Sequence, residues 1–162
     1  IALTKSIAVI NDLINGSIDD GANPKAIPGA ELLYTINAIN SGRGQSDDGS
    51  LILQDEIPLN SDLYVGTITC SGTDLGPVCF QEGANPNESG LSFTFNSLTD
   101  NSDDLFFSTD GSDFTYEPVD SGDGYDPAIR FIRMTPANEL NSAPKDASKQ
   151  PEFKFHYQTR LN

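Results

Sequence analysis

Cys70 and Cys79 are the two cysteines of the chain, and their spacing points directly to a covalent bond. They flank a turn-rich segment that contains Gly76 and Pro77 and lies between two β-like runs. A turn brings its two ends together, so we predict an intrachain disulfide, with two buried free thiols as the alternative. The lack of tryptophan, the single methionine and the many Asn, Asp, Gly and Ser residues favour the oxidising compartment that this bond requires.

Carboxylates are the second group that could do chemistry, because 24 acidic residues against 9 basic ones give a net charge of −15. Ca²⁺ takes roughly six to eight oxygen ligands, which Gly-punctuated acidic loops can supply. The candidate ligands are Asp100, Asp103, Asp104, Asp110, Asp113, Asp120, Asp123 and Asp126. No loop matches the EF-hand pattern, so the alternative is a set of turns in which Asp side chains cap their own backbone. Ca²⁺ is the one cofactor that the sequence suggests.

The sequence argues against an enzyme. His156 is the only histidine, and we expect it to face solvent on the strand face opposite to Phe155. A catalytic triad would also need a nucleophile such as a Gly-x-Ser-x-Gly elbow, and zinc would need more His or Cys ligands. A glycosidase would surround its carboxylate pair with an aromatic cleft, but the aromatic residues here alternate at core-facing positions. We therefore predict no catalytic residues.

The elements that position these residues are predicted to be strands. Apolar side chains recur with a period of two, and no window of helical periodicity is free of Gly or Pro. The alternation is clearest at residues 32–39, 91–96 and 153–158. Further predicted strands are residues 1–10, 51–57, 63–70, 78–81, 114–117 and 129–134. Turn residues separate these runs, and no linker divides the chain. We predict one all-β domain over residues 1–162, an antiparallel sandwich of about nine strands.

Charge and hydropathy exclude several partners. A net charge of −15 repels nucleic-acid phosphates and anionic membrane surfaces alike. No run approaches the roughly 18 apolar residues of a membrane span. The sequence begins at Ile1 without an initiator methionine, so we expect an exported, processed chain at the cell surface.

Four short motifs in the first part of the chain carry a resemblance. They are Leu3-Thr4-Lys5-Ser6, Asn23-Pro24-Lys25-Ala26-Ile27-Pro28-Gly29-Ala30, Tyr34-Thr35-Ile36 with Asn40-Ser41-Gly42, and Asp55-Glu56-Ile57-Pro58. This pattern resembles the conserved-repeat, immunoglobulin-like domain of large bacterial and archaeal surface proteins. The resemblance implies an immunoglobulin-like sandwich and a structural role at a surface. It brings no catalytic residues, and it spans residues 1–66, about 40% of the chain.

The apolar N-terminal strand suggests how such a domain could assemble. Its candidate assembly residues are Ile1, Leu3, Ile7, Val9 and Ile10. We expect a subunit of an extracellular bacterial fibre, in which this strand pairs with a sheet edge of another copy of the chain. An ordinary first strand in its own sheet is equally compatible with the sequence. The alternative function is a secreted adhesion or carbohydrate-binding module that recognises a surface glycan, with or without Ca²⁺.

Overall fold

The computed structural model describes residues 1–18, 23–70, 73–74, 76–145 and 148–162, and these residues form strands, turns and irregular segments without a helix. Every ladder between two named strands is antiparallel. The strands are β1 (Ala2–Asp12), β2 (Gly16–Ser17), β3 (Glu31–Ile39), β4 (Leu53–Glu56), β5 (Ser61–Tyr64), β6 (Thr69–Cys70), β7 (Thr73–Asp74), β8 (Val78–Glu82), β9 (Leu105–Ser108), β10 (Tyr125–Asp126), β11 (Phe131–Met134) and β12 (Glu152–Leu161). The predicted all-β class is thereby confirmed.

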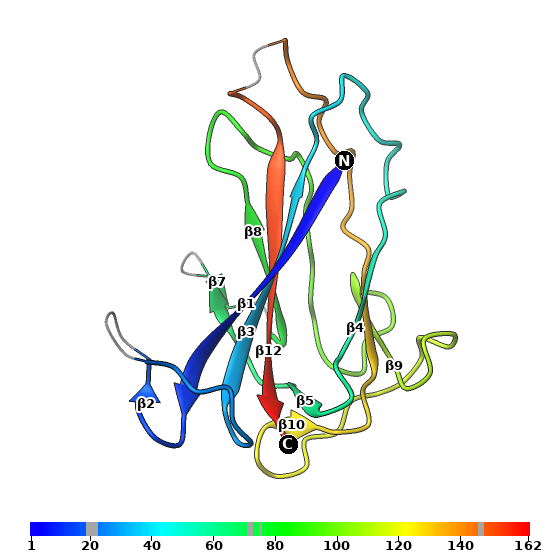
Figure 1. Ribbon diagram of the computed structural model, residues 1–162. Helices are drawn as coiled ribbons and strands as arrows, with labels where there is room; N and C mark the ends of the chain where they lie inside the picture. The colour runs from blue at the N-terminus through cyan, green and yellow to red at the C-terminus, as the bar shows by residue number, and fades with distance from the viewer. Residues whose placement is uncertain (19–22, 71–72, 75, 146–147) are drawn as a thin grey trace.

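The larger sheet is built around β3 and β12, which lie side by side in Figure 1. Its order is β10-β5-β12-β3-β1-β2, and β8 pairs with β12 beside β5. β12 is therefore a central strand, hydrogen-bonded to β3 on one side and to β8 and β5 on the other. The chain's first and last long strands, β1 and β12, flank β3 and fix it between them.

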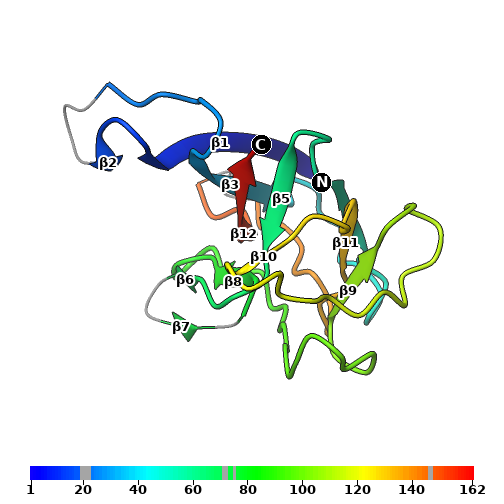
Figure 2. The same cartoon turned by 90° about the horizontal axis from the view of Figure 1, so that it is seen from below.

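A smaller sheet of order β4-β11-β9 packs over one face of the larger one (Figure 2). The two sheets share one hydrophobic core, because buried side chains of both belong to a single cluster. Tyr34, Phe155 and Tyr157 enter it from the larger sheet, and Phe107 and Ile132 enter it from the smaller one. The smaller sheet has fewer strands, so part of the larger sheet extends beyond it.

The number of strands differs from the predicted figure of about nine, since twelve are present in the described residues. Four of them, β2, β6, β7 and β10, have only two residues each. The predicted strand at residues 63–70 is split into β5 and β6, and β9 was not predicted at all. Short strands of this kind leave too few alternating positions to be recognised from a sequence.

The predicted strand at residues 91–96 was wrong, and so was the one at residues 114–117. The first segment makes only an isolated bridge, between Ser92 and Ala137. Its side chains still alternate, with Leu91 and Phe93 buried in the core. Its backbone N–H groups, however, donate to side-chain carboxylates: Thr94 N to Asp104 Oδ2 at 2.7 Å and Asn96 N to Asp103 Oδ2 at 2.9 Å. Residues 114–117 likewise have one bridge, from Tyr116 to Phe107.

Candidate assembly site

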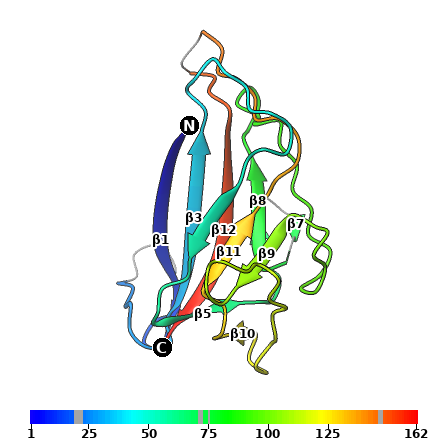
Figure 3. The ribbon, with the colours of Figure 1, turned by 90° about the vertical axis from the view of Figure 1, so that its right-hand side faces the viewer.

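β1 lies at the edge of the larger sheet, where it pairs with β3 from Ala2 to Asn11 (Figure 3). β2 and Ile18 pair with its last residues, from Ile10 onward. On the side of residues 2–9 that faces away from β3, no strand of the described part of the chain pairs with β1. We call this side the β1 edge. An open edge presents backbone donors and acceptors that can pair with another strand.

Apolar side chains of β1 remain exposed although they point toward the core side of the sheet. Leu3 and Ile7 are opposite the buried Ala38 and Tyr34 of β3, yet they are 60% and 58% exposed. Neither side chain is among the members of the core cluster that the two sheets share. Val9, opposite Leu32, is half-buried and packs against the core.

The remaining residues of the predicted assembly strand lie elsewhere. Ile1 precedes β1 and is 63% exposed, whereas Ile10 is half-buried at an irregularity of the ladder between Val9 and Asn11. In this structure the strand lies in its own sheet. Its pairing with a neighbouring subunit stays a prediction.

Lys5 is a charged side chain between Leu3 and Ile7 on the core side of β1, and it connects the two sheets. Its Nζ lies 2.8 Å from Oδ1 and 2.7 Å from Oδ2 of Asp55 on β4. The hydroxyl of Tyr157 donates to Asp55 Oδ2 at 2.8 Å. Tyr157 also stacks on Tyr34 with ring centroids 4.9 Å apart, and Lys5 Nζ lies 4.8 Å from the Tyr34 centroid. Burial and the neighbouring Asp55 carboxylate raise the pKa of Tyr157, which keeps its hydroxyl protonated as a donor.

Asp12 fixes the other end of β1. Its carboxylate accepts hydrogen bonds from the backbone N–H groups of Ile14, Asn15 and Lys25 and from the Asn15 side chain. Burial alone would raise the pKa of Asp12, but these bonds outweigh it and lower the pKa from 3.8 to about 2. The base of β1 is therefore held in place by a network to which residues 2–9 do not contribute.

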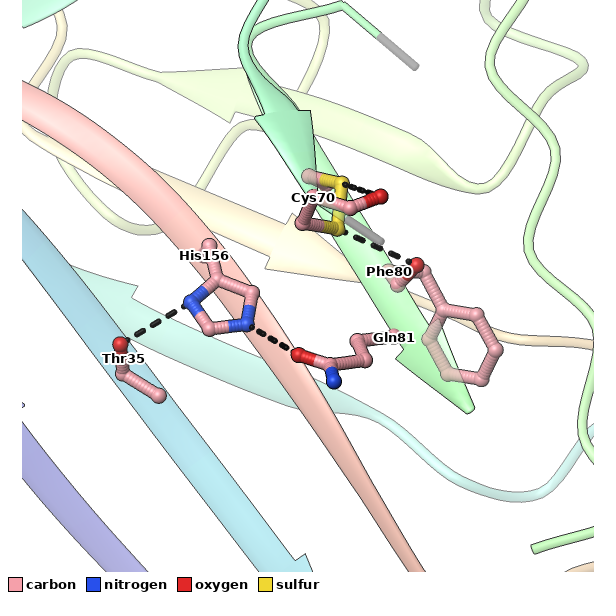
Figure 4. The surroundings of a disulfide bond; sticks show 6 residues. Thr35, Cys70, Phe80, Gln81 and His156 are labelled. Carbon is pink, nitrogen blue, oxygen red and sulfur yellow. Dashed lines mark hydrogen bonds between the residues drawn. A yellow bond between two sulfur atoms is a disulfide. The ribbon is translucent and has the colours of Figure 1, made fainter. Parts of the chain in front are cut away.

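The predicted disulfide between Cys70 and Cys79 is confirmed, with Cα atoms 6.0 Å apart (Figure 4). Cys70 ends β6 and Cys79 is the second residue of β8. The bond therefore ties the short β6-β7 hairpin to a strand of the larger sheet. Part of the predicted turn between the cysteines lies outside the described residues.

His156 is half-buried, so it is less exposed than predicted. It lies on the expected face of β12, opposite to Phe155, but β12 is a central strand and its neighbours cover the ring. Nδ1 is 3.0 Å from Thr35 Oγ1 and Nε2 is 3.0 Å from Gln81 Oε1, as Figure 4 shows. Burial lowers the pKa of His156, and nearby Lys154 lowers it further. The arrangement is that of a neutral, structural histidine.

The acidic residues predicted as calcium ligands bind their own loops. Asp110 Oδ1 accepts from the backbone of Ser112 and Asp113, and Asp120 Oδ1 accepts from Gly122 and Gly124. Asp100, Asp113 and Asp126 make similar short-range bonds. Hydrogen bonds from Ser102 lower the pKa of Asp100, and those from Ser112 and Asp113 lower that of Asp110. These contacts correspond to the capping interpretation of the acidic loops.

Asp103, Asp104 and Asp123 have longer-range partners. Asp103 and Asp104 accept from the extended segment at residues 94–96, and Asp123 Oδ2 lies 2.7 Å from Arg160 Nη2. Within the described ranges, no group of three or more His, Cys, Asp or Glu side chains is arranged to hold a metal ion. The carboxylates that the sequence placed in one group are thus distributed over separate turns.

A groove on the face of the larger sheet that carries Ile10 and Leu33 was not predicted. Its lining includes Glu31, Tyr64, Thr67, Thr69, Tyr125 and Gln158. The Tyr125 hydroxyl donates to Glu31 Oε1 at 3.1 Å and accepts from Gln158 Nε2 at 3.3 Å. Burial and Glu31 raise the pKa of Tyr125 to about 12. Residues from β1, β3, β5, β6, β10, β12 and the segment before β6 meet here, which no local sequence pattern could indicate.

Comparison with known proteins gives no relative: no family model, no curated protein and no solved structure matches the chain. Nor do the described residues include a helix able to cross a membrane. What the chain does must therefore be argued from its own geometry, above all from the β1 edge and the contacts of Lys5.

Proposed function

We propose that this chain is a non-enzymatic structural subunit of an extracellular bacterial surface fibre, assembled by β-strand addition through β1. The observation that carries the proposal is the long β1 edge, flanked by Leu3 and Ile7 with well over half of each side chain exposed. Strand addition joins such a strand to a sheet edge of another subunit by main-chain hydrogen bonds. The partner is a second copy of the chain. A head-to-tail contact of this kind does not close on itself and extends into a filament.

The remaining features fit that setting. Two antiparallel sheets over one core are compatible with a single immunoglobulin-like sandwich over residues 1–162, as the resemblance implies. The Cys70–Cys79 disulfide suits an oxidising, extracellular environment. The acidic side chains cap turns, which stiffens loops without a cofactor. A net charge of −15 keeps the outer surface hydrated.

Deleting residues 1–10 is expected to abolish fibre formation, because it removes the strand that joins one subunit to the next. Negative-stain microscopy of the purified chain, with and without the deletion, measures the result. A Leu3→Ser/Ile7→Ser variant keeps the β1 backbone and should form shorter or fewer fibres, since it removes only the apolar contacts. Leu59→Ala, at a residue 80% exposed outside β1, is the matched control and should assemble normally. Fibres of normal diameter from the deletion variant would refute the proposal.

A second candidate function, glycan binding, is favoured by the groove beside Tyr64. Protein sites for small polar ligands combine aromatic surface with a few oriented polar groups, and this groove offers a half-buried tyrosine ring beside Glu31, Thr67 and Gln158. The Glu31–Tyr125–Gln158 hydrogen bonds hold two of those polar groups in fixed orientations. Such a site would make the fibre, or the isolated domain, adhesive.

Tyr64→Ala is expected to weaken glycan binding by about fivefold or more, because stacking against a ring contributes on the order of 1 kcal/mol or more. A glycan array with the intact chain identifies the ligand, and calorimetry then compares the variants. Tyr116→Ala, a half-buried tyrosine outside the groove, is the control. If the intact chain binds no glycan on the array, this second function is rejected.

A further inference from the structure

Lys5 and Asp55 form a contact that is suited to selecting the strand that occupies the position beside β3. Lys5 lies between Leu3 and Ile7 on the core side of β1, and the Asp55 side chain is only 16% exposed. A carboxylate at such a partly buried position needs a cation or donors to offset its lost hydration. A strand with an apolar or acidic residue at the Lys5 position would leave Asp55 without its cation.

The residues that contact the Lys5 side chain lie outside β1. Tyr34 and Tyr157 are 3% and 0% exposed, and their rings are nearly parallel, at an interplanar angle of 3°. Asp55 is held by the Tyr157 hydroxyl. These contacts do not involve β1, so we expect them to persist when residues 1–9 leave and to accept a lysine in the same register of another strand.

Residues 1–9 are also the part of β1 that can separate from the rest. The ladder with β3 is interrupted between Val9 and Asn11, and beyond this point Asp12 and β2 hold the chain. Before it, the side chains are mostly exposed, so their departure uncovers little of the core. An exchange between two copies would restore every contact that it breaks, which is the usual condition for swapping a terminal element.

We infer that Lys5 and Asp55 make the assembly specific for a second copy of this chain: in the fibre, residues 1–9 of one subunit occupy the β3 edge of the next, and Lys5 of the first contacts Asp55 of the second. This inference rests on the proposed function and deepens it, because it names the edge to which β1 is added: β3 of the next subunit, in place of that subunit's own residues 1–9. It assigns to Lys5 the selection of partner and register, while Leu3 and Ile7 keep the exposed positions that they have in the single chain.

Two charge reversals test the exchange. In Lys5→Asp, two acidic groups meet at the contact; in Asp55→Lys, two basic groups meet. Each variant alone should assemble at least about tenfold more slowly than the wild type, because like charges are brought together. In an equimolar mixture, the Lys5→Asp strand can pair with an Asp55→Lys subunit, where the introduced aspartate meets the introduced lysine. The Asp55→Lys strand, which keeps Lys5, can pair with a Lys5→Asp subunit, which keeps Asp55. Exchange between chains should therefore restore assembly to within about twofold of the wild-type rate.

The outcomes separate this inference from the proposed function. If the wild type forms no fibres, the proposed function fails, and the inference fails with it. A second outcome is that the wild type assembles, each variant alone assembles slowly, and the mixture also assembles slowly. This outcome would mean that β1 remains in its own sheet, and it would overturn the inference while fibre assembly stands. Normal assembly of both single variants also overturns it. Circular dichroism of each variant before mixing establishes that its sheets are intact.

A cross-link that leaves Asp55 unchanged provides an independent measurement. Thr4 and Asn37 are directly opposite each other in the β1-β3 ladder, so a Thr4→Cys/Asn37→Cys variant can form a disulfide across it. Exchange predicts a ladder of covalent multimers from oxidised fibres on a non-reducing denaturing gel. Monomers alone in assembled material would show that each strand stays in its own subunit, and would overturn the inference without relying on a charge variant that folds poorly.

Discussion

Phe155→Ala is expected to lower the free energy of unfolding by about 3–5 kcal/mol, the range for removing a fully buried phenylalanine ring. Phe155 is 0% exposed on the central strand β12. Its ring centroid lies 5.0 Å from that of Phe93, 5.3 Å from that of Phe80 and 5.7 Å from that of Phe153. These rings come from three separate segments, so the cavity would weaken contacts that join distant parts of the chain. Urea denaturation followed by circular dichroism measures the change.

Leu59→Ala is the control for this truncation as well, since Leu59 is 80% exposed and its loss should change stability by no more than about 0.5 kcal/mol. If Phe155→Ala lowered the free energy of unfolding by less than about 1 kcal/mol, the described core would be contradicted, because removing a fully packed ring leaves a cavity that costs more than this. The result also bears on assembly. A variant that lowers fibre yield only because it unfolds would show a loss of stability in this measurement.

Removing the disulfide by Cys70→Ala/Cys79→Ala is expected to destabilise the chain by about 2–3 kcal/mol. The bond closes a short loop with a sequence separation of 9, so it restricts the unfolded chain less than a long-range bond would. Truncating Cys79, which is 0% exposed, adds a packing loss at β8. Thermal unfolding of the double variant beside the wild type measures the total.

Reduction of the wild type separates the two contributions. A thiol reductant should lower the wild-type melting temperature and leave that of the double variant unchanged, because only the wild type has a bond to break. If the reductant changes neither, the cysteines are not bonded in the native protein. In that case the argument for an oxidising compartment loses its main support.

The long strands of this fold could be predicted from sequence because their alternation is regular. Residues 153–158 place Phe153, Phe155 and Tyr157 on one face, and the structure buries all three with 1% or less exposed. β3 follows the same rule. In both strands one face packs on the smaller sheet, so the period of two in the sequence reflects a real two-sided environment.

Alternation alone did not reveal how the backbone is paired. Leu91 and Phe93 alternate as strand residues do, but Asp103 and Asp104 accept hydrogen bonds that a neighbouring strand would otherwise accept. Side-chain pattern reports burial, whereas strand pairing depends on what lies beside the backbone. Strand β9 was missed because its apolar residues span only Leu105–Phe107 among many acidic and polar residues, although its backbone pairs with β11.

The candidate site was only partly accessible from sequence. The apolar residues of β1 could be identified, and so could the cysteine pair. The role of Lys5 could not, because Asp55 lies 50 residues away and reaches it only through the packing of two sheets. The same limit applies to the groove beside Tyr64, whose lining comes from widely separated segments.

The tyrosine pair beneath Lys5 also gives the protein an optical signal of its own. The chain has no tryptophan, so its ultraviolet emission comes from its five tyrosines. Tyr157 is hydrogen-bonded to a carboxylate and stacked on Tyr34, and we expect both contacts to quench its emission. In the exchange that we propose, the departure of Lys5 would open the edge of this pair to solvent. We therefore expect tyrosine fluorescence to report the departure and arrival of the first strand, without any label attached to the chain.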